Sequence, residues 1–342
     1  MQQLIYVGLD LGSSRCHQIV RDSNGSVLSS RLVPTSEEHL RNAFTGLGDD
    51  VSVHLEAGEL AVWVCSIIKP LVKSVTVSHP RTLAWIAKDS NKSDAVDAGK
   101  LAELLRLGRV HEVYCETDRS RLTFKHLVVH YEQMSREQAR LKSKIKARLR
   151  CLGIIRKDAR VFSGAGQAEL FASIEPAEIR RMFGQLFAVL NQTVDMQEEA
   201  KQAMIAAAKQ FPEVRLLQTA PGVGPITACR FAAYVHTPAR FSNKRKFWRY
   251  CRLGITRRES NGKRLSHPRL DNAGSGSLKD VSRKVFEAAR RTNRDHSFKR
   301  CFEQSLENTK NAVHARLSTQ RKILATLRAM WLSMKPYRDE PG

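Results

Sequence analysis

The stretch Ile5–Gly12, Ile-Tyr-Val-Gly-Leu-Asp-Leu-Gly, constrains the fold of this chain more than any other. Its apolar and β-branched residues predict a strand, and a carboxylate, Asp10, lies within it. Burying an ionised carboxylate costs free energy unless a metal ion or a phosphate-binding loop makes use of the charge. Asp10 is therefore the first candidate for a residue with a chemical role. The simpler alternative is that it ends an edge strand and caps the turn at Gly12–Ser14.

The composition predicts a globular protein with an anionic partner. The chain has 342 residues, enough for two or three domains, and 42% of them are hydrophobic. Lys and Arg number 57 against 34 acidic residues, which gives a net charge of +23. A compact fold with this charge repels itself unless a polyanion offsets it. Nucleic acid is thus the favoured partner, ahead of a membrane surface.

The absence of targeting signals in the sequence and the pattern of its cysteines indicate the compartment in which the protein works. No apolar run reaches membrane-spanning length, and Met1–Leu4 has no signal-peptide character. The seven cysteines are scattered without a Cys-x-x-Cys pair, which favours reduced thiols and argues against a zinc site. We therefore expect a cytoplasmic protein with no membrane partner.

The first third of the chain alternates between strand and helix patterns. Helices are expected at 36–44 and 59–70, and strands at 4–11, 16–21, 26–33, 51–56 and 74–78. The pair Asn24-Gly25 is a strong signal for a hairpin turn. Three strands followed by alternating helices and strands is the order of an α/β RNase H-like domain, which we place at residues 1–115.

Four carboxylates stand at the ends of these elements. Asp10 lies on the first strand, and Glu56 ends a later one. Ser93 is a good N-cap for a helix whose first turn carries Asp94 and Asp97 on one face, although acids there also simply favour the helix dipole. Small hard cations prefer oxygen ligands, and two of them can clamp the attacking and leaving oxygens of a displacement at phosphorus. The four acids together therefore predict a site for two Mg²⁺ ions, with Mn²⁺ as a substitute.

Residues 116–211 carry a helical pattern that predicts a coiled-coil insertion. Between Thr117 and Ile154, apolar residues recur at steps of three and four: Leu127, Tyr131, Met134, Leu141, Ile145 and Leu152. The run Glu175–Phe211 has a similar stripe: Ile179, Met182, Leu186, Ala200 and Met204. The linker at 156–167 contains two glycines, so we expect a helical hairpin. Its stripe is either intramolecular core with a solvated basic face, or a dimerisation arm that contacts nucleic acid.

Residues 212–342 predict a mainly α-helical domain. Gly222 and Gly224 precede an apolar helix at 226–235 and resemble a helix-hairpin-helix element, in which backbone N–H groups approach a phosphate. An ordinary glycine-rich turn is the alternative. Further helices are expected at 277–291 and 308–332.

Two basic segments of this domain suit nucleic acid. The stretch Phe241–Arg252 interleaves cations with aromatics, as in phosphate contacts combined with base stacking, or else forms an amphipathic helix with Phe247, Trp248 and Cys251 inward. In the loop-like segment Arg257–Arg264, cations surround Ser260 and could stabilise an alkoxide and an attacked phosphate. The candidate nucleic-acid-binding residues are Gly222, Gly224, Lys244, Arg245, Lys246, Arg249, Arg257, Arg258 and Lys263.

The ordered set of motifs resembles the IS110 family of insertion-sequence transposases, also described as bridge-RNA-guided recombinases, over nearly the whole chain. In the first half the resemblance lies in Gly8-Leu-Asp10, Leu55-Glu56-Ala57 and Lys92-Ser-Asp-Ala-Val-Asp-Ala98. In the second half it lies in Pro221-Gly-Val-Gly224, Arg252-Leu-Gly-Ile255 and Ser260-x-Gly262-Lys263.

The resemblance implies a RuvC-like domain whose Asp-Glu-Asp-Asp set, here Asp10, Glu56, Asp94 and Asp97, binds Mg²⁺. It also implies a C-terminal transposase domain whose serine forms a covalent phosphoserine intermediate with DNA. Family members are bacterial homodimers that assemble into tetramers, in which one subunit's carboxylates face another's serine. A structured non-coding RNA pairs with donor and target DNA. A nucleoid-associated protein is therefore expected.

One departure from the family pattern concerns the nucleophile. Many relatives have Ser-Ser-Gly where this chain has Ser260-Asn261-Gly262. Ser260 supplies the only hydroxyl of that tripeptide, and Ser266 is the fallback.

Two other functions fit parts of the sequence. A RuvC-like junction endonuclease needs the carboxylates and no serine. An actin-like or sugar-kinase ATPase would use Asp10–Ser14 as its first phosphate loop. We find no Gly-Gly adenosine motif later in the sequence, and a small-molecule kinase has no need of the large positive charge.

Overall fold

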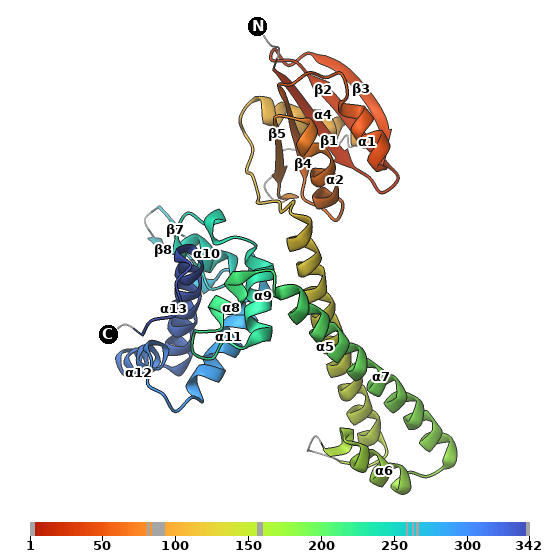
Figure 1. Cartoon of the computed structure of the whole chain (residues 1–342), viewed down its shortest axis with the longest axis vertical. Helices are drawn as coiled ribbons and strands as arrows, with labels where there is room; N and C mark the ends of the chain where they lie inside the picture. The colour runs from red at the N-terminus through yellow and green to blue at the C-terminus, as the bar shows by residue number, and fades with distance from the viewer. Residues whose placement is uncertain are drawn as a thin grey trace. The chain divides into compact units, whose positions relative to one another are not determined.

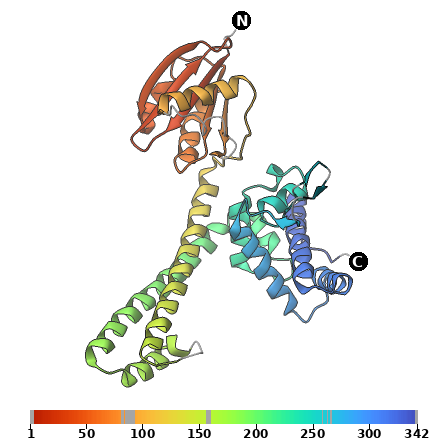
Figure 2. The same cartoon turned by 180° about the vertical axis from the view of Figure 1, so that it is seen from behind.

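The computed structural model describes residues 4–80, 83, 93–155, 160–257, 259–261, 263–264 and 267–339. The chain divides into two compact units, Met1–Leu122 and Thr123–Gly342. Figures 1 and 2 show both units from opposite sides.

The first unit is built on a five-stranded sheet with the order β3-β2-β1-β4-β5. Its strands are β1 (Ile5–Leu11), β2 (Arg15–Arg21), β3 (Val27–Pro34), β4 (Val51–Glu56) and β5 (Ser74–Ser78). The first three are antiparallel, whereas β4 runs parallel to both β1 and β5. All five predicted strands are therefore present. The expected hairpin turn has Gly25 at φ +91°, a conformation that glycine adopts at little cost.

Helices cover both faces of this sheet. Val7, Leu9, Val53 and Leu55 pack in one core with α1 (Glu37–Phe44) and α2 (Ala61–Ile68), which the short 3₁₀ helix Lys69–Leu71 follows. Side chains alternate along a strand, so Gly8 and His54 point to the opposite face. That face is covered by α4 (Asp94–Arg106), which passes close to β1, β2 and β4 (Figure 1). This mixed sheet is consistent with an RNase H-like domain.

Long helices form the first part of the second unit. α5 (Arg119–Cys151) and α7 (Ala177–Ala208) lie side by side, and α6 (Gly164–Ser173) packs near their far end (Figures 1 and 2). Both long helices agree with the predicted helical runs. Near α6, the apolar residues of the two long helices form an intramolecular core. The residues buried together include Ile145, Leu149, Leu170, Phe183 and Phe187. Leu152, expected in the same stripe, is 42% exposed because α5 ends at the preceding residue.

The C-terminal part of this unit is a helical bundle. Its helices are α8 (Pro212–Leu217), α9 (Pro225–Val235), the 3₁₀ helix Pro238–Arg240, α10 (Lys244–Tyr250), α11 (Gly276–Arg290), α12 (Ser297–Thr309) and α13 (Ala312–Ser333). Their core also contains Phe124 and Val128 of α5 and Met204 of α7. The base of the long helices is thus part of the bundle's core.

Two short antiparallel strand pairs lie between α10 and α11 in the sequence. β6 (Ile255–Thr256) pairs with β9 (Arg269–Leu270), and β7 (Glu259–Ser260) pairs with β8 (Lys263–Arg264). The expectation of a plain loop at 257–264 was therefore wrong where these strands form. None of the helices in the described ranges has the length and apolar character to span a membrane.

Candidate active site and nucleic-acid surface

Asp10 and Glu56 lie at the same end of two adjacent parallel strands. The register pairs Gly8 with His54 and Leu9 with Leu55, so the next position along each strand is an acid. Asp10 lies two residues beyond Gly8 and Glu56 two beyond His54, which places both on the α4 face of the sheet. Both carboxylates are half-buried.

The N-terminus of α4 brings the other two acids to this face. Ser93 caps the helix by accepting a hydrogen bond from the backbone N–H of Val96, and Asp94 and Asp97 occupy the first turn. The helix can approach β1 because residue 8 is glycine: a Cβ there would lie 1.9 Å from the carbonyl oxygen of Ala98. Gly8 therefore determines how closely Asp97 approaches Asp10.

His54 links β4 to α4 and β5 beside the acids, and it is a functional residue that the sequence analysis does not single out. Its Nδ1 bonds the carbonyl of Leu101 on α4 at 2.8 Å, and its Nε2 bonds Ser78 Oγ on β5 at 2.9 Å. Burial lowers the pKa of His54, which keeps the ring neutral. A polar residue between the buried Val53 and Leu55 was the only available signal.

The charges of the four acids act on one another. The pKa of Asp10 is raised from 3.8 to about 6, first by burial and then by the charges of Asp94, Asp97 and Glu56. Asp97 Oδ1 is buried without a hydrogen-bond partner in the part of the chain that the structure describes. The site therefore has an excess of negative charge and at least one unsatisfied oxygen.

The four acids are the right type of ligand for a divalent cation, but their side chains are not yet close enough to share one ion. All four donors are carboxylates, the ligands that Mg²⁺ prefers, and a cation would relieve both the repulsion and the unsatisfied oxygen. Among the described residues, no three Asp, Glu, His or Cys side chains stand ready to share one ion. A bound cation would have to draw the carboxylates together.

Ser260 lies on a hairpin of the second unit. In β7 it pairs with Lys263 of β8, and the next residue, Asn261, has a φ of +51°. Asparagine tolerates this left-handed conformation better than most residues. Ser266, Arg258 and Gly262 lie outside the described residues.

The basic residues of α10 face solvent while its aromatics anchor the helix. Lys244, Arg245, Lys246 and Arg249 are exposed, and so is Arg257 beyond the helix. Phe247 and Cys251 are fully buried in the bundle core, and Trp248 is half-buried. The two interpretations of Phe241–Arg252 are therefore compatible, since one face packs and the other presents cations.

The two glycines before α9 differ in their surroundings. Gly222 has φ +77°, and a Cβ there would lie 2.5 Å from the carbonyl oxygen of Val285, so close packing on α11 already explains this glycine. Gly224 is the N-cap of α9 and is exposed, with no atom within 4 Å of a Cβ placed there. Gly224 is therefore the more exposed of the two glycines.

Comparison with known protein families gives two matches in chain order. Residues 7–153 match the DEDD transposase model of the IS110 family, described as a transposase. Residues 214–300 match the model described as transposase IS116/IS110/IS902 family. No curated protein matches the chain. The two matches together span most of the sequence and include Asp10 and Ser260. They favour a transposase over the ATPase alternative. The chain therefore belongs to the IS110 family of transposases.

Proposed function

We propose that this transposase recombines insertion-sequence DNA through a covalent phosphoserine–DNA intermediate, with a structured RNA that selects the sites. The observation that carries the proposal is the shared face of Asp10, Glu56, Asp94 and Asp97, where burial and mutual repulsion leave negative charge uncompensated. Such a set in a transposase family suits the binding of divalent ions beside a DNA phosphodiester.

The four carboxylates would hold Mg²⁺, which when bound supplies positive charge for the non-bridging oxygens of the attacked phosphate. The protein residues contribute position: Gly8 and His54 set α4 against the strands, and Ser93 fixes the first turn that carries Asp94 and Asp97.

Ser260 is the proposed nucleophile. Its Oγ forms a bond to phosphorus while the bond from phosphorus to one sugar oxygen breaks, and the hydroxyl proton passes to a carboxylate of the site. The released sugar oxygen takes up a proton and later attacks the phosphoserine of an exchanged strand, which frees the serine. Cations near Ser260 stabilise the charge that develops on the phosphate.

Donor DNA, target DNA and guide RNA are the proposed partners, and a homodimer that assembles into a tetramer is the proposed active form. Base pairing by the RNA would select sequence, which leaves backbone and shape to the protein. The net charge of +23 and the exposed cations of α10 support polyanionic partners.

The direct test compares Ser260→Ala, Ser266→Ala and Asp10→Ala in a cellular recombination assay and in a denaturing assay for protein–DNA adducts. We expect Ser260→Ala and Asp10→Ala to abolish recombination, and Ser266→Ala to retain it. The wild type should give an adduct that Ser260→Ala lacks. Recombination by Ser260→Ala would refute the serine assignment. Carboxylate-dependent cleavage without any adduct would instead indicate the junction endonuclease.

A further inference from the structure

A basic cavity of about 740 Å³ lies in the C-terminal bundle, between α10, the segment after it and α13. This volume is typical of pockets that hold a small ligand. Trp248 and Leu253 contribute apolar wall. The cations of its lining are Arg245, Lys246, Arg249, Arg257 and Arg321.

Trp248 and Arg321 are fixed in this wall by a closed ring of three hydrogen bonds. The backbone N–H of Leu253 donates to the carbonyl of Trp248 at 2.8 Å. Arg321 Nε donates to the carbonyl of Leu253 at 2.8 Å, and Trp248 Nε1 donates to the carbonyl of Arg321 at 2.9 Å. The aromatic ring and the guanidinium are therefore held in place before any ligand arrives, which reduces the entropy lost on binding.

Arg321 is a cation without a carboxylate partner among the described residues. Arg249, by contrast, pairs with Asp271 at 2.6 Å. Arg321 is half-buried, and burial lowers its pKa. A desolvated guanidinium whose terminal nitrogens are available gains most from an anionic, hydrogen-bond-accepting group such as a phosphate.

The cavity adjoins the segment that carries the candidate nucleophile. Ile255 of β6 and Arg257 line it, and the chain continues from Arg257 toward β7 and Ser260. A ligand here would therefore lie close along the chain to the point where DNA is attacked.

We propose that the Trp248–Arg321 cavity binds one unpaired nucleotide of the DNA strand, with its base against Trp248 and its phosphate at Arg321. This inference rests on the proposed function, and it adds that the strand is opened or a nucleotide extruded near Ser260. Bases within a continuous duplex are stacked and cannot enter a pocket without leaving the stack.

The test measures DNA binding by the full-length Ser260→Ala protein, so that no chemistry occurs. The probes are a fluorescein-labelled single strand of about twelve nucleotides and a hairpin duplex of the same sequence. Arg321→Met and Trp248→Leu are introduced separately. Arg316→Met is the matched control, because Arg316 is an exposed cation on the same helix outside the cavity.

We expect Arg321→Met and Trp248→Leu each to weaken single-strand binding by about 10-fold, and duplex binding by less than about 2-fold. Trp248→Phe, which keeps an aromatic ring, should recover most of the loss. Arg316→Met should weaken the binding of both probes equally, by less than about 2-fold. Equal losses for single strand and duplex, or losses no larger than those of Arg316→Met, would overturn the proposal.

Photo-crosslinking gives a readout that needs no substitution in the cavity itself. A single strand containing one 4-thiothymidine is irradiated with the Ser260→Ala protein, and the adducts are mapped by mass spectrometry. Crosslinks on the peptide that contains Trp248 are expected. Crosslinks confined to other regions would contradict the proposal. An RNA strand of the same sequence serves as a further binding probe, and a loss of RNA binding by Arg321→Met equal to its loss of DNA binding would also contradict the proposal. Because binding is measured without a nucleophile, failure of the serine mechanism would leave this result unchanged.

Discussion

At the scale of single residues, the raised pKa of Asp10 makes the stability of the sheet unit depend on pH. Its pKa is raised from 3.8 to about 6, so between these values the folded protein holds a proton that the unfolded chain has lost. The stability contributed by this group therefore falls as pH rises through that window, and the ionised form is a penalty above it.

Replacing Asp10 with asparagine should remove that penalty. In the presence of a chelator, we expect Asp10→Asn to raise the free energy of unfolding by about 1 kcal/mol at neutral pH, allowing for the screening of a half-exposed group. The gain should shrink as pH falls toward the unfolded value of 3.8. Urea denaturation across this range measures it. Added Mg²⁺ should reverse the order and stabilise only the wild type, since binding to the folded state alone raises stability.

Gly8 is the residue whose replacement should disturb the acid set without removing a charge. A methyl group there meets the Ala98 carbonyl at 1.9 Å, so α4 must shift away from β1. We expect Gly8→Ala to cost about 1–3 kcal/mol of stability and to abolish recombination. Gly58→Ala is the control within the same unit, because a Cβ at Gly58 meets nothing within 4 Å. Equal stability of the two variants would contradict this account of Gly8.

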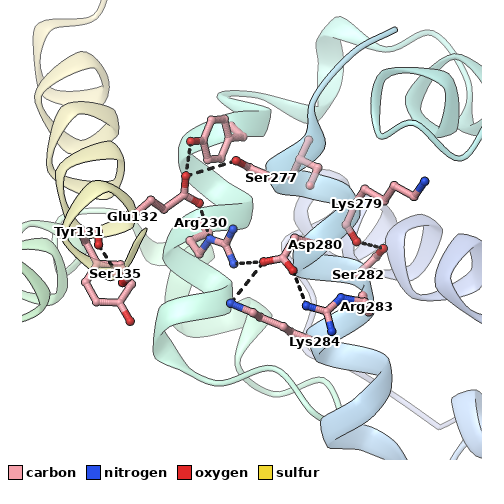
Figure 3. Close-up of polar contacts among 12 residues, drawn as sticks. Tyr131, Glu132, Ser135, Arg230, Ser277, Lys279, Asp280, Ser282, Arg283 and Lys284 are labelled. Atoms are coloured by element: carbon pink, nitrogen blue, oxygen red, sulfur yellow. Dashed lines mark hydrogen bonds and ion pairs between the residues drawn. The ribbon is translucent and has the colours of Figure 1, made fainter. Parts of the chain in front are cut away.

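At the scale of elements, a buried ionic network joins three helices of the second unit. Arg230 of α9 has a side chain only 7% exposed, and it pairs with Glu132 of α5 and with Asp280 of α11 (Figure 3). Glu132 also accepts hydrogen bonds from Tyr234 at 2.7 Å and from Ser277 at 3.2 Å. The network thus fixes the base of α5 against the bundle.

Removing the central cation should leave two carboxylates without their shared partner. We expect Arg230→Met to cost about 3–5 kcal/mol, as breaking a buried pair does. Arg283→Met, which removes a 46% exposed partner of the same Asp280, should cost less than about 1 kcal/mol. Chemical denaturation of both variants provides the comparison, and similar losses would show that burial of Arg230 is not what matters.

Local sequence patterns predict most of the strands and helices, but not all of them. The strands and helices between Ile5 and Ser78 follow from local patterns and turns. Gly164 and Gly166 predict a linker at 156–167, yet α6 begins at Gly164: Ser163 caps the helix, and a Cβ at Gly166 would lie 2.0 Å from the Arg160 carbonyl oxygen. These glycines begin a helix and permit close packing there. The sequence analysis predicts helices at 277–291 and 308–332 but none for most of α12.

Some residues of the candidate sites can be predicted from the sequence, and others are brought together only by packing. Asp10 and Glu56 were singled out because acids at strand ends are visible in the sequence. Trp248 and Arg321 lie 73 positions apart, and only the packing of α10 on α13 joins them, so no local pattern could place them in one cavity.

At the scale of the whole molecule, the proposed assembly makes a prediction about mixed subunits. If the carboxylates of one subunit act with the serine of another, Asp10→Ala and Ser260→Ala proteins should complement each other. We expect each alone to give no protein–DNA adduct, and the mixture to give one that maps to the Asp10→Ala chain, which retains the serine. A mixture as inactive as its components would indicate that each subunit acts with its own acids.

The core shared by α5, α7 and the C-terminal bundle has a consequence for dissecting the protein. Phe124, Val128 and Met204 are buried among bundle residues, and α7 packs on α9, so a fragment that starts at residue 212 would uncover apolar surface of the bundle, including that of α9. Such a fragment should aggregate or fold poorly, whereas one that begins near residue 119 retains both long helices. The smallest autonomous piece that carries Ser260 therefore includes nearly two thirds of the chain.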